Sequence, residues 1–208
     1  NGLAMPPKMT LKNILQIMTR PEWALRTLFK GQPTFDTLKP YTPEGLNLKQ
    51  LGLFMDKTFS GRLNEEKIKP IRDMWPRKLV LKGVASEGDA QRAIDLGLDG
   101  IIVSNHGGRQ MSFVPGVASI FESVVHAVGH RAEVFLDGGI RRGEDIIKAR
   151  AIGATAACGG RPWYWGLAAG GEQGVDKVLS VLAADVDRTL ALLGEEKFSN
   201  VTEHYLYR

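Results

Sequence analysis

Four short apolar runs, each followed by glycine and charged residues, constrain the fold of this chain more than any other feature. The runs lie at 79–81, 101–103, 134–136 and 154–158, and helical patterns separate them along the chain. Strands that alternate with helices are typical of parallel βα units. Because the carboxyl ends of parallel strands meet at one edge of a sheet, we predict an α/β fold with the four polar segments at that edge.

The helical segments have recognisable boundaries. Asn64 and Ser86 are N-cap candidates for two helices, and Ile68, Ile71 and Trp75 are expected to turn toward a core. Further helices are predicted at 118–128, 143–152 and 174–193, with glycines near their ends. The segment 46–63 lacks a clear period, and we predict a loop there with at most a short helix.

The second polar segment, GIIVSNHGGRQ at 100–110, places two chemically useful side chains directly after a strand. The imidazole of His106 can take a proton near neutral pH. The guanidinium of Arg109 can hold a carboxylate through two parallel hydrogen bonds. The pair predicts proton abstraction from a small carboxylic acid. The alternative is a strand-end loop whose histidine and arginine are solvated, and these residues alone do not separate the two interpretations.

Two later segments favour a phosphate site. DGGIRRG at 137–143 and GGR at 159–161 follow consecutive strands, and their glycines expose backbone N–H groups beside helix N-termini. Arg141 or Arg142, together with Arg161, adds full positive charge. Two tight turns with solvated arginines are the alternative. Lys82, at the end of the first strand, could stabilise negative charge on a cofactor or simply extend into solvent.

Residues 1–64 differ in composition from the rest of the chain, since they hold six of its ten prolines. Two short helices are predicted, one capped by Thr10 and running to Met18, the other from Pro21 to Lys30. Both carry large apolar side chains, and the basic residues around them are Lys8, Lys12, Arg20, Arg26 and Lys30. Such helices suit an anionic membrane surface. Packing on the parent domain or on a neighbouring subunit is the alternative.

Composition narrows the class of protein. The 208 residues carry a net charge of +4, and there is no zinc-ligand spacing or aromatic RNA-binding signature, so we expect no nucleic-acid partner and no metal site. A single cysteine, Cys158, fits a reducing compartment and is expected to be buried and inert. No apolar run approaches the ~20 residues that span a bilayer.

The motifs VLKG, GIIVSNHGGRQ, VFLDGGIRRGEDIIKARAIGA and GGRPWYWGLAAGGEQGV occur here in that order. Their sequence resembles the C-terminal half of the FMN-dependent 2-hydroxy-acid dehydrogenases and oxidases. NGLAMPPKMTLKN and PEWALRTLFKG resemble the membrane-bound branch that acts on mandelate or lactate. The resemblance implies the C-terminal half of a (β/α)8 TIM barrel, about four βα units at 65–208, after a helical and loop insertion at 1–64 that contacts a membrane.

The resemblance also implies roles for individual residues. His106 matches the active-site base, and Arg109 the residue that binds the substrate carboxylate. The positions that match FMN contacts are Lys82, Ser104, Asp137, Gly138, Gly139, Ile140, Arg141, Gly160 and Arg161. The implied reaction oxidises an (S)-2-hydroxy acid, mandelate or lactate, to the 2-oxo acid and passes electrons to a membrane quinone. The implied state is a homotetramer, peripheral on the cytoplasmic face of the inner membrane.

Departures from the family pattern leave alternatives open. Met111 and Ser112 stand where relatives commonly have Leu-Asp, and Gly159 replaces a larger aliphatic residue. The family's first four barrel strands have no counterpart here, although a complete barrel needs about 250 residues. One alternative is a soluble oxidase that uses oxygen and lies in the cytoplasm. Another is a half-barrel without catalytic activity that binds FMN or phosphate.

Overall fold

A computed structural model describes residues 10–30, 36–43, 45–46, 48–58 and 63–207. The chain divides into two compact units, Asn1–Leu63 and Asn64–Arg208. In the first unit lie α1 (Leu11–Met18), α2 (Pro21–Lys30), the short 3-10 helix η1 (Asp36–Tyr41) and α3 (Leu48–Thr58). Thr10 caps α1 as predicted, because its hydroxyl accepts a hydrogen bond from the Asn13 amide at 3.3 Å. Lys8 falls outside the described residues.

Segment 46–63 is more helical than predicted, since α3 extends over 11 residues. Its apolar residues recur at the spacing of three and four that forms one helix face, and Gly52 weakens that signal in the sequence alone. In the described part of the chain, no helix has both the length and the apolarity needed to cross a membrane.

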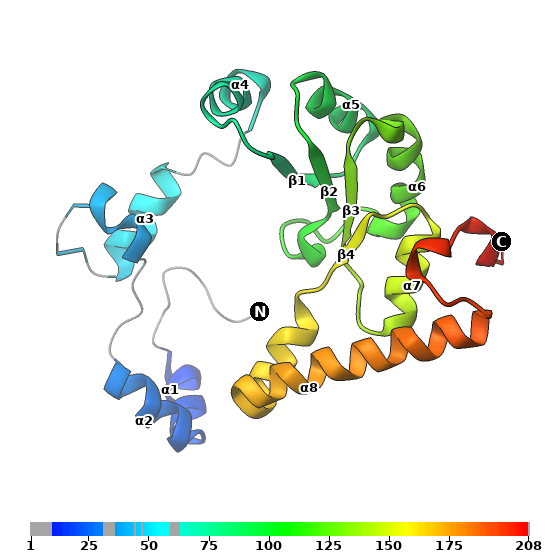
Figure 1. Cartoon of the computed structure of the whole chain (residues 1–208). Coiled ribbons are helices and arrows are strands. Elements are labelled where there is room, and N and C mark those ends of the chain that lie inside the picture. The colour runs from blue at the N-terminus through cyan, green and yellow to red at the C-terminus, as the bar shows by residue number, and fades with distance from the viewer. Residues whose placement is uncertain (1–9, 31–35, 44, 47, 59–62, 208) are drawn as a thin grey trace. The chain divides into compact units, whose positions relative to one another are not determined.

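The second unit is built on a four-stranded parallel sheet in the order β1-β2-β3-β4 (Figure 1). The strands are β1 (Val80–Val84), β2 (Gly100–Ser104), β3 (Glu133–Asp137) and β4 (Ala156–Cys158). The connecting helices are α5 (Glu87–Asp95), α6 (Val117–Val128) and α7 (Gly143–Ala151). The predicted strand–helix alternation and the parallel direction of all four strands are therefore confirmed.

One face of this sheet is packed against helices α5 and α6. Alternate strand residues supply that face, because successive side chains in a strand point to opposite sides. Ile101 and Val103 are completely buried there, and Val134 and Leu136 nearly so. They contact the inward residues of α6, of which Phe121 is the largest. Burying such side chains contributes about 1.5–3 kcal/mol each, which sets the register of the sheet.

The intervening strand positions carry the polar side chains. Lys82, Ser104, Asp137 and Cys158 occupy the other phase of the alternation, and Asp137 is aligned with Ser104 on one side and Cys158 on the other. The two faces of the sheet thus have different roles. One face builds the core with α5 and α6, and the other displays titratable groups at the carboxyl ends of the strands.

The C-terminal part packs around α7. The last long helix, α8 (Arg161–Leu193), contacts α7, and Ile147, Ala151, Leu190 and Val201 form a second apolar cluster. The predicted helix at 174–193 is confirmed as the second of two helical pieces in α8, whereas the first piece, which begins at Arg161, was not predicted. Pro162 suits a first helical turn, and the backbone of Gly170 and Gly171 departs from helical values, so two helical pieces meet at that glycine pair.

Helix α4 (Glu65–Met74) opens at Asn64, whose side chain accepts a hydrogen bond from the Lys67 amide at 3.2 Å. Of its three predicted core residues, only Ile68 is buried. The expectation for Ile71 and Trp75 was wrong, since both remain about half exposed. The reason is that α4 precedes β1, an outer strand of the sheet, and packs extensively against none of the other helices and strands of the described unit.

Candidate active site

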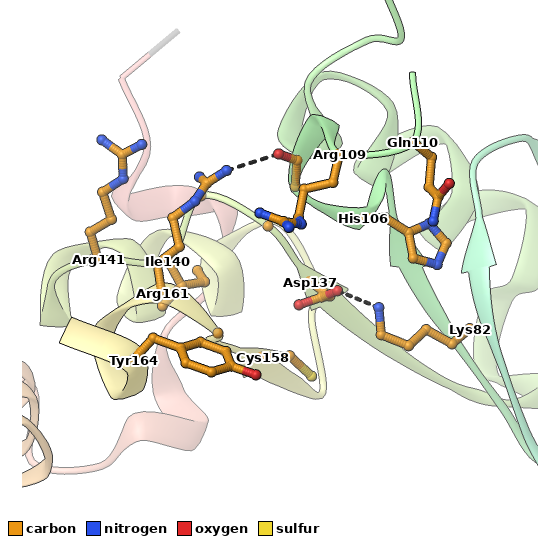
Figure 2. A pocket seen from close by; sticks show the side chains of 14 residues that line it. Lys82, His106, Arg109, Gln110, Asp137, Ile140, Arg141, Cys158, Arg161 and Tyr164 are labelled. Atoms are coloured by element: carbon orange, nitrogen blue, oxygen red, sulfur yellow. Dashed lines mark hydrogen bonds and ion pairs between the residues drawn. The ribbon is translucent and has the colours of Figure 1, made fainter. Parts of the chain in front are cut away.

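A cavity of about 700 Å³ opens at the carboxyl edge of the sheet. Every site residue predicted from the sequence lines it, with the exception of Ser104, which lies buried beside it. The lining residues are Lys82, His106, Gly107, Arg109, Gln110, Asp137, Gly138, Gly139, Ile140, Arg141, Cys158, Gly160, Arg161 and Tyr164. They come from the carboxyl ends of the strands and from the segments that follow them, including the start of α8, and Figure 2 shows their side chains around the cavity.

Lys82, Ser104 and Asp137 form a closed network on the cavity wall. The Lys82 ammonium lies 2.6 Å from Asp137 Oδ2 and 3.1 Å from Ser104 Oγ, and the Ser104 hydroxyl donates to Asp137 Oδ2 at 2.7 Å. Burial acts to raise the pKa of Asp137, but the hydrogen bonds from Lys82 and Ser104 outweigh it and lower that pKa. The carboxylate is therefore charged, and it holds the lysine ammonium at the cavity, while the lysine side chain remains 46% exposed.

A β-bulge at Gly83 brings the backbone of β1 against His106. The pairing with β2 shifts between Lys82 and Val84, and Gly83 takes φ of +94°. A Cβ atom at Gly83 would lie 2.9 Å from His106 Cε1. Bulges of this kind often re-aim side chains beside functional sites. Here the bulge forms one wall of the space that holds the imidazole.

The loop after β2 is held in a tight left-handed turn. His106 itself has φ of +53°, a conformation that costs a non-glycine residue about 1–2 kcal/mol. Its amide donates to Ser104 Oγ at 3.1 Å, and the Gly107 amide donates to Asn105 Oδ1 at 3.0 Å. These bonds offset the strain. They place His106 and Arg109 so that both line the same cavity. The sequence alone did not determine how these two side chains are oriented.

The other end of the cavity is built to receive an anion. Helix α8 begins there, and its N-cap, Gly160, provides no side-chain hydrogen bond to the first turn. At Gly139 and Gly160 a Cβ atom would meet nothing within 4 Å, so a ligand can approach the backbone closely. Arg161 and Arg141 add positive charge to the same wall. Helix N-terminal amides with nearby arginines favour a phosphate group.

The N-terminus of α7 is already satisfied by carboxylates. The amides of Arg141 and Arg142 both donate to Asp145 Oδ2, at 2.9 and 3.0 Å, and the Gly143 amide donates to Asp185 Oδ2 at 2.7 Å. Of the two helix starts predicted to bind phosphate, the one at α8 therefore has the more available donors. Arg141 lines the cavity and Arg142 does not, which decides between the two arginines.

Sequence reasoning missed Tyr164 and misjudged Cys158. Tyr164 lies one turn into α8 and is largely exposed, and its ring is directed toward Cys158 along the cavity (Figure 2). The helix N-terminus at Gly160 could have indicated it, because residues in a first turn border whatever binds there. Cys158 was expected to be buried, yet it is only partly covered and lines the cavity. Burial still raises the pKa of its thiol, which keeps it a weak nucleophile.

Comparison with known proteins identifies relatives over nearly the whole chain. Residues 1–208 match the FMN-dependent dehydrogenase family. The chain is 37% identical over 206 residues to (S)-mandelate dehydrogenase of Pseudomonas putida, covering 99% of this chain and 51% of that protein. It is 42% identical over 153 residues to a peroxisomal (S)-2-hydroxyacid oxidase of Arabidopsis thaliana, covering 74% and 42%. The chain thus spans about half the length of these relatives.

The fold comparison agrees. A crystal structure of the monotopic membrane protein (S)-mandelate dehydrogenase superposes with a TM-score of 0.89 at 38% identity, covering 98% of this chain and 54% of that one. The predicted α/β fold, half of a TIM barrel, is confirmed by this likeness.

The residues of the cavity fit FMN, the cofactor of that family. Two arginines, two glycines that accept close approach and an uncapped helix start suit its phosphate. Lys82 offers a cation at the far side of the cavity from these groups, where an electron-rich ring system would be favoured. Family match, fold and cavity agree, and the chain belongs to the FMN-dependent dehydrogenase family.

Proposed function

We propose that this chain supplies the FMN-binding and acid-binding half of an enzyme that oxidises an (S)-2-hydroxy acid to the 2-oxo acid. Mandelate or lactate is the proposed substrate, and a membrane quinone the proposed acceptor. One observation carries the proposal. His106 as the candidate base, Arg109 as the candidate carboxylate-binding residue, and the anion-binding groups Gly139, Arg141, Gly160 and Arg161 line a single cavity of about 700 Å³. The similarity to a mandelate dehydrogenase and a 2-hydroxyacid oxidase supports the substrate class.

Each side chain has a proposed role in that reaction. Arg109 binds the substrate carboxylate through its planar fork, and His106 accepts a proton as the alcohol carbon becomes a carbonyl. FMN, when bound, supplies the acceptor for the electron pair. Lys82 provides positive charge near the cofactor, and Asp137 holds Lys82 in place. Arg141, Arg161 and the adjacent glycines hold the phosphate.

The role of His106 is tested in the complete, FMN-loaded protein by anaerobic stopped-flow absorbance. His106→Ala should slow flavin bleaching by (S)-mandelate or L-lactate by about 10²–10⁴-fold, the usual contribution of a general base. The bound flavin spectrum should be unchanged, which shows that the cofactor site survives. Bleaching at the wild-type rate would remove the base assignment.

Arg109→Lys tests the carboxylate clamp in the same assay. Lysine keeps the charge but cannot reproduce two parallel hydrogen bonds, so the apparent affinity for the acid should fall by at least tenfold. An alcohol without a carboxylate is the matched probe, because its weak binding should not respond to the change. An unaltered affinity for the acid would contradict the clamp.

A soluble oxidase that passes electrons to oxygen is the second candidate, favoured by the likeness to the plant 2-hydroxyacid oxidase. Oxygen consumption and quinone reduction, measured side by side on the same preparation, separate the two. A 208-residue chain that is colourless and inert after addition of FMN would favour a half-barrel without catalytic activity for this chain alone.

The exposed faces of α1 and α2 support membrane attachment. Leu11 and Met18 of α1 and Trp23 and Phe29 of α2 are exposed, and α1 buries none of its residues. We propose that these helices lie in the headgroup region of an anionic membrane, on its cytoplasmic face, with a homotetramer as the assembled form.

Vesicle sedimentation tests this attachment. Leu15→Glu combined with Phe29→Glu should reduce binding to anionic vesicles by more than tenfold, because each charge opposes burial in the interface and is repelled by the lipid. Wild-type protein with neutral vesicles is the control for the electrostatic part. Undiminished binding of the double variant would exclude these helices as the contact.

A further inference from the structure

We propose that Arg161 is a positioning residue that couples the phosphate end of the cavity to the loop that presents His106 and Arg109. The inference rests on the proposed function. It gives Arg161, so far proposed only to bind the FMN phosphate, a second role. It begins from one contact: Arg161 Nη2 donates to the Gly107 carbonyl oxygen at 2.8 Å (Figure 2). The two residues are 54 positions apart in the chain.

Gly107 is a sensitive point of the loop. It follows His106 directly and lies two residues before Arg109, and its φ of +66° belongs to the left-handed region. The hydrogen bonds from Gly107 and His106 amides hold the start of the turn to Asn105 and Ser104. The Gly107 carbonyl is instead held from outside the loop, by a charged donor at the start of α8. Such charge-assisted hydrogen bonds are about twice as strong as neutral ones.

The approach of the guanidinium to Gly107 is close. A Cβ atom at Gly107 would lie 3.3 Å from Arg161 Nη2, whereas a Cβ atom at Gly108 would meet nothing within 4 Å. Arg161 also lines a second cavity of about 380 Å³, together with Gly107, Gly108 and Gly138. The guanidinium of Arg161 therefore contacts the loop and lines both cavities.

A guanidinium has five N–H donors, and this contact uses one of them. The remaining donors can hold a phosphate oxygen while Nη2 stays on Gly107. Because arginine loses much rotational freedom when it is held, a phosphate that pins the guanidinium reduces the cost of keeping its bond to the loop. Phosphate binding should thus order the loop, and by reciprocity an ordered loop should strengthen phosphate binding.

Hydrogen–deuterium exchange of the full-length protein without FMN tests the coupling independently of catalysis. Inorganic phosphate, and separately FMN, should slow exchange of the amides at 107–109 in the wild type by at least threefold. In Arg161→Lys and Arg161→Gln that protection should be lost, with Arg142→Gln as the control for a neighbouring charge. Equal protection in all variants, or faster exchange when phosphate binds, would overturn the proposal.

The loop side of the contact offers a matched pair. Gly107→Ala and Gly108→Ala impose similar backbone strain, at φ of +66° and +70°, but only the first introduces an atom beside Arg161. Gly107→Ala should weaken FMN binding several-fold by fluorescence titration, and Gly108→Ala should weaken it less than twofold. Equal effects of the two would contradict the coupling.

Steady-state kinetics distinguish this coupling from a simple loss of cofactor. At saturating FMN, Arg161→Lys should still lower kcat about tenfold and raise KM for the acid, the loss expected for one charge-assisted hydrogen bond. Full recovery of both constants at saturating FMN would show that Arg161 serves the phosphate alone. A protein that shows the exchange effect but oxidises no 2-hydroxy acid would instead refute the proposed function and leave the coupling intact.

Discussion

At the residue scale, the site depends on backbone positions that tolerate no side chain. Gly83 at the β1 bulge is the clearest case, since its φ is +94° and a Cβ atom there would lie 2.9 Å from His106 Cε1. A glycine after Lys82 is visible in the sequence, but its contact partner lies 23 residues farther on. The geometry of the proposed base is therefore controlled in part from β1, the strand that also carries Lys82.

Gly83→Ala should impair activity beyond its effect on stability. The added methyl group must displace the imidazole, and overpacking of this kind costs about 1–3 kcal/mol in addition to the left-handed strain. We expect kcat/KM for the 2-hydroxy acid to fall at least tenfold in the complete protein. Gly194→Ala is the matched control, because its φ is +73° with nothing within 4 Å, at the end of α8. Similar losses of activity in both variants would show that strain alone matters.

At the element scale, the amino ends of the strands are fastened by Asp99, just before β2. Its carboxylate forms ion pairs with Lys78 at 2.9 Å and with Arg72 at 3.0 Å, and it accepts a hydrogen bond from the Leu79 amide at 2.9 Å. Hydrogen bonds from Lys78 and from the Leu79 amide lower the pKa of Asp99 to about 2, with a smaller contribution from Arg72. One side chain thus joins α4, the start of β1 and the start of β2.

This arrangement predicts a pH dependence of stability. Because the folded pKa is below the unfolded value of 3.8, the contribution of Asp99 is fully present above about pH 4 and is lost as pH falls toward 2. Urea unfolding of Asp99→Asn should therefore show a lower midpoint than the wild type at pH 7. The difference should shrink between pH 4 and pH 2, and a difference independent of pH would contradict the linkage.

At the scale of the whole molecule, the described sheet is part of a barrel. Its four parallel strands put the cavity at one edge, and the relatives are about twice as long as this chain. The groups proposed to hold the phosphate, which are the start of α8, Gly139 and both arginines, all line the cavity of this chain. Cofactor binding should consequently depend strongly on the phosphate group.

FMN should stabilise the purified chain more than riboflavin does. A ligand at 100 times its Kd adds about 2.7 kcal/mol, which for a protein of this size raises Tm by roughly 5–10 °C. Riboflavin lacks the phosphate and should shift Tm by less than a third of that amount at the same concentration. Equal shifts, measured by circular dichroism, would show that the arginines and the start of α8 do not hold the phosphate.

The local pattern of the sequence determined the strands, their parallel order and the polar segments after them, because apolar periodicity and glycine placement act over a few residues. It also pointed to His106, Arg109 and Lys82. Only the tertiary structure decided that carboxylates occupy the start of α7 and that Arg161 contacts Gly107. These outcomes join segments up to 54 residues apart, and their geometry follows from strand register and helix packing, which no short stretch of sequence contains.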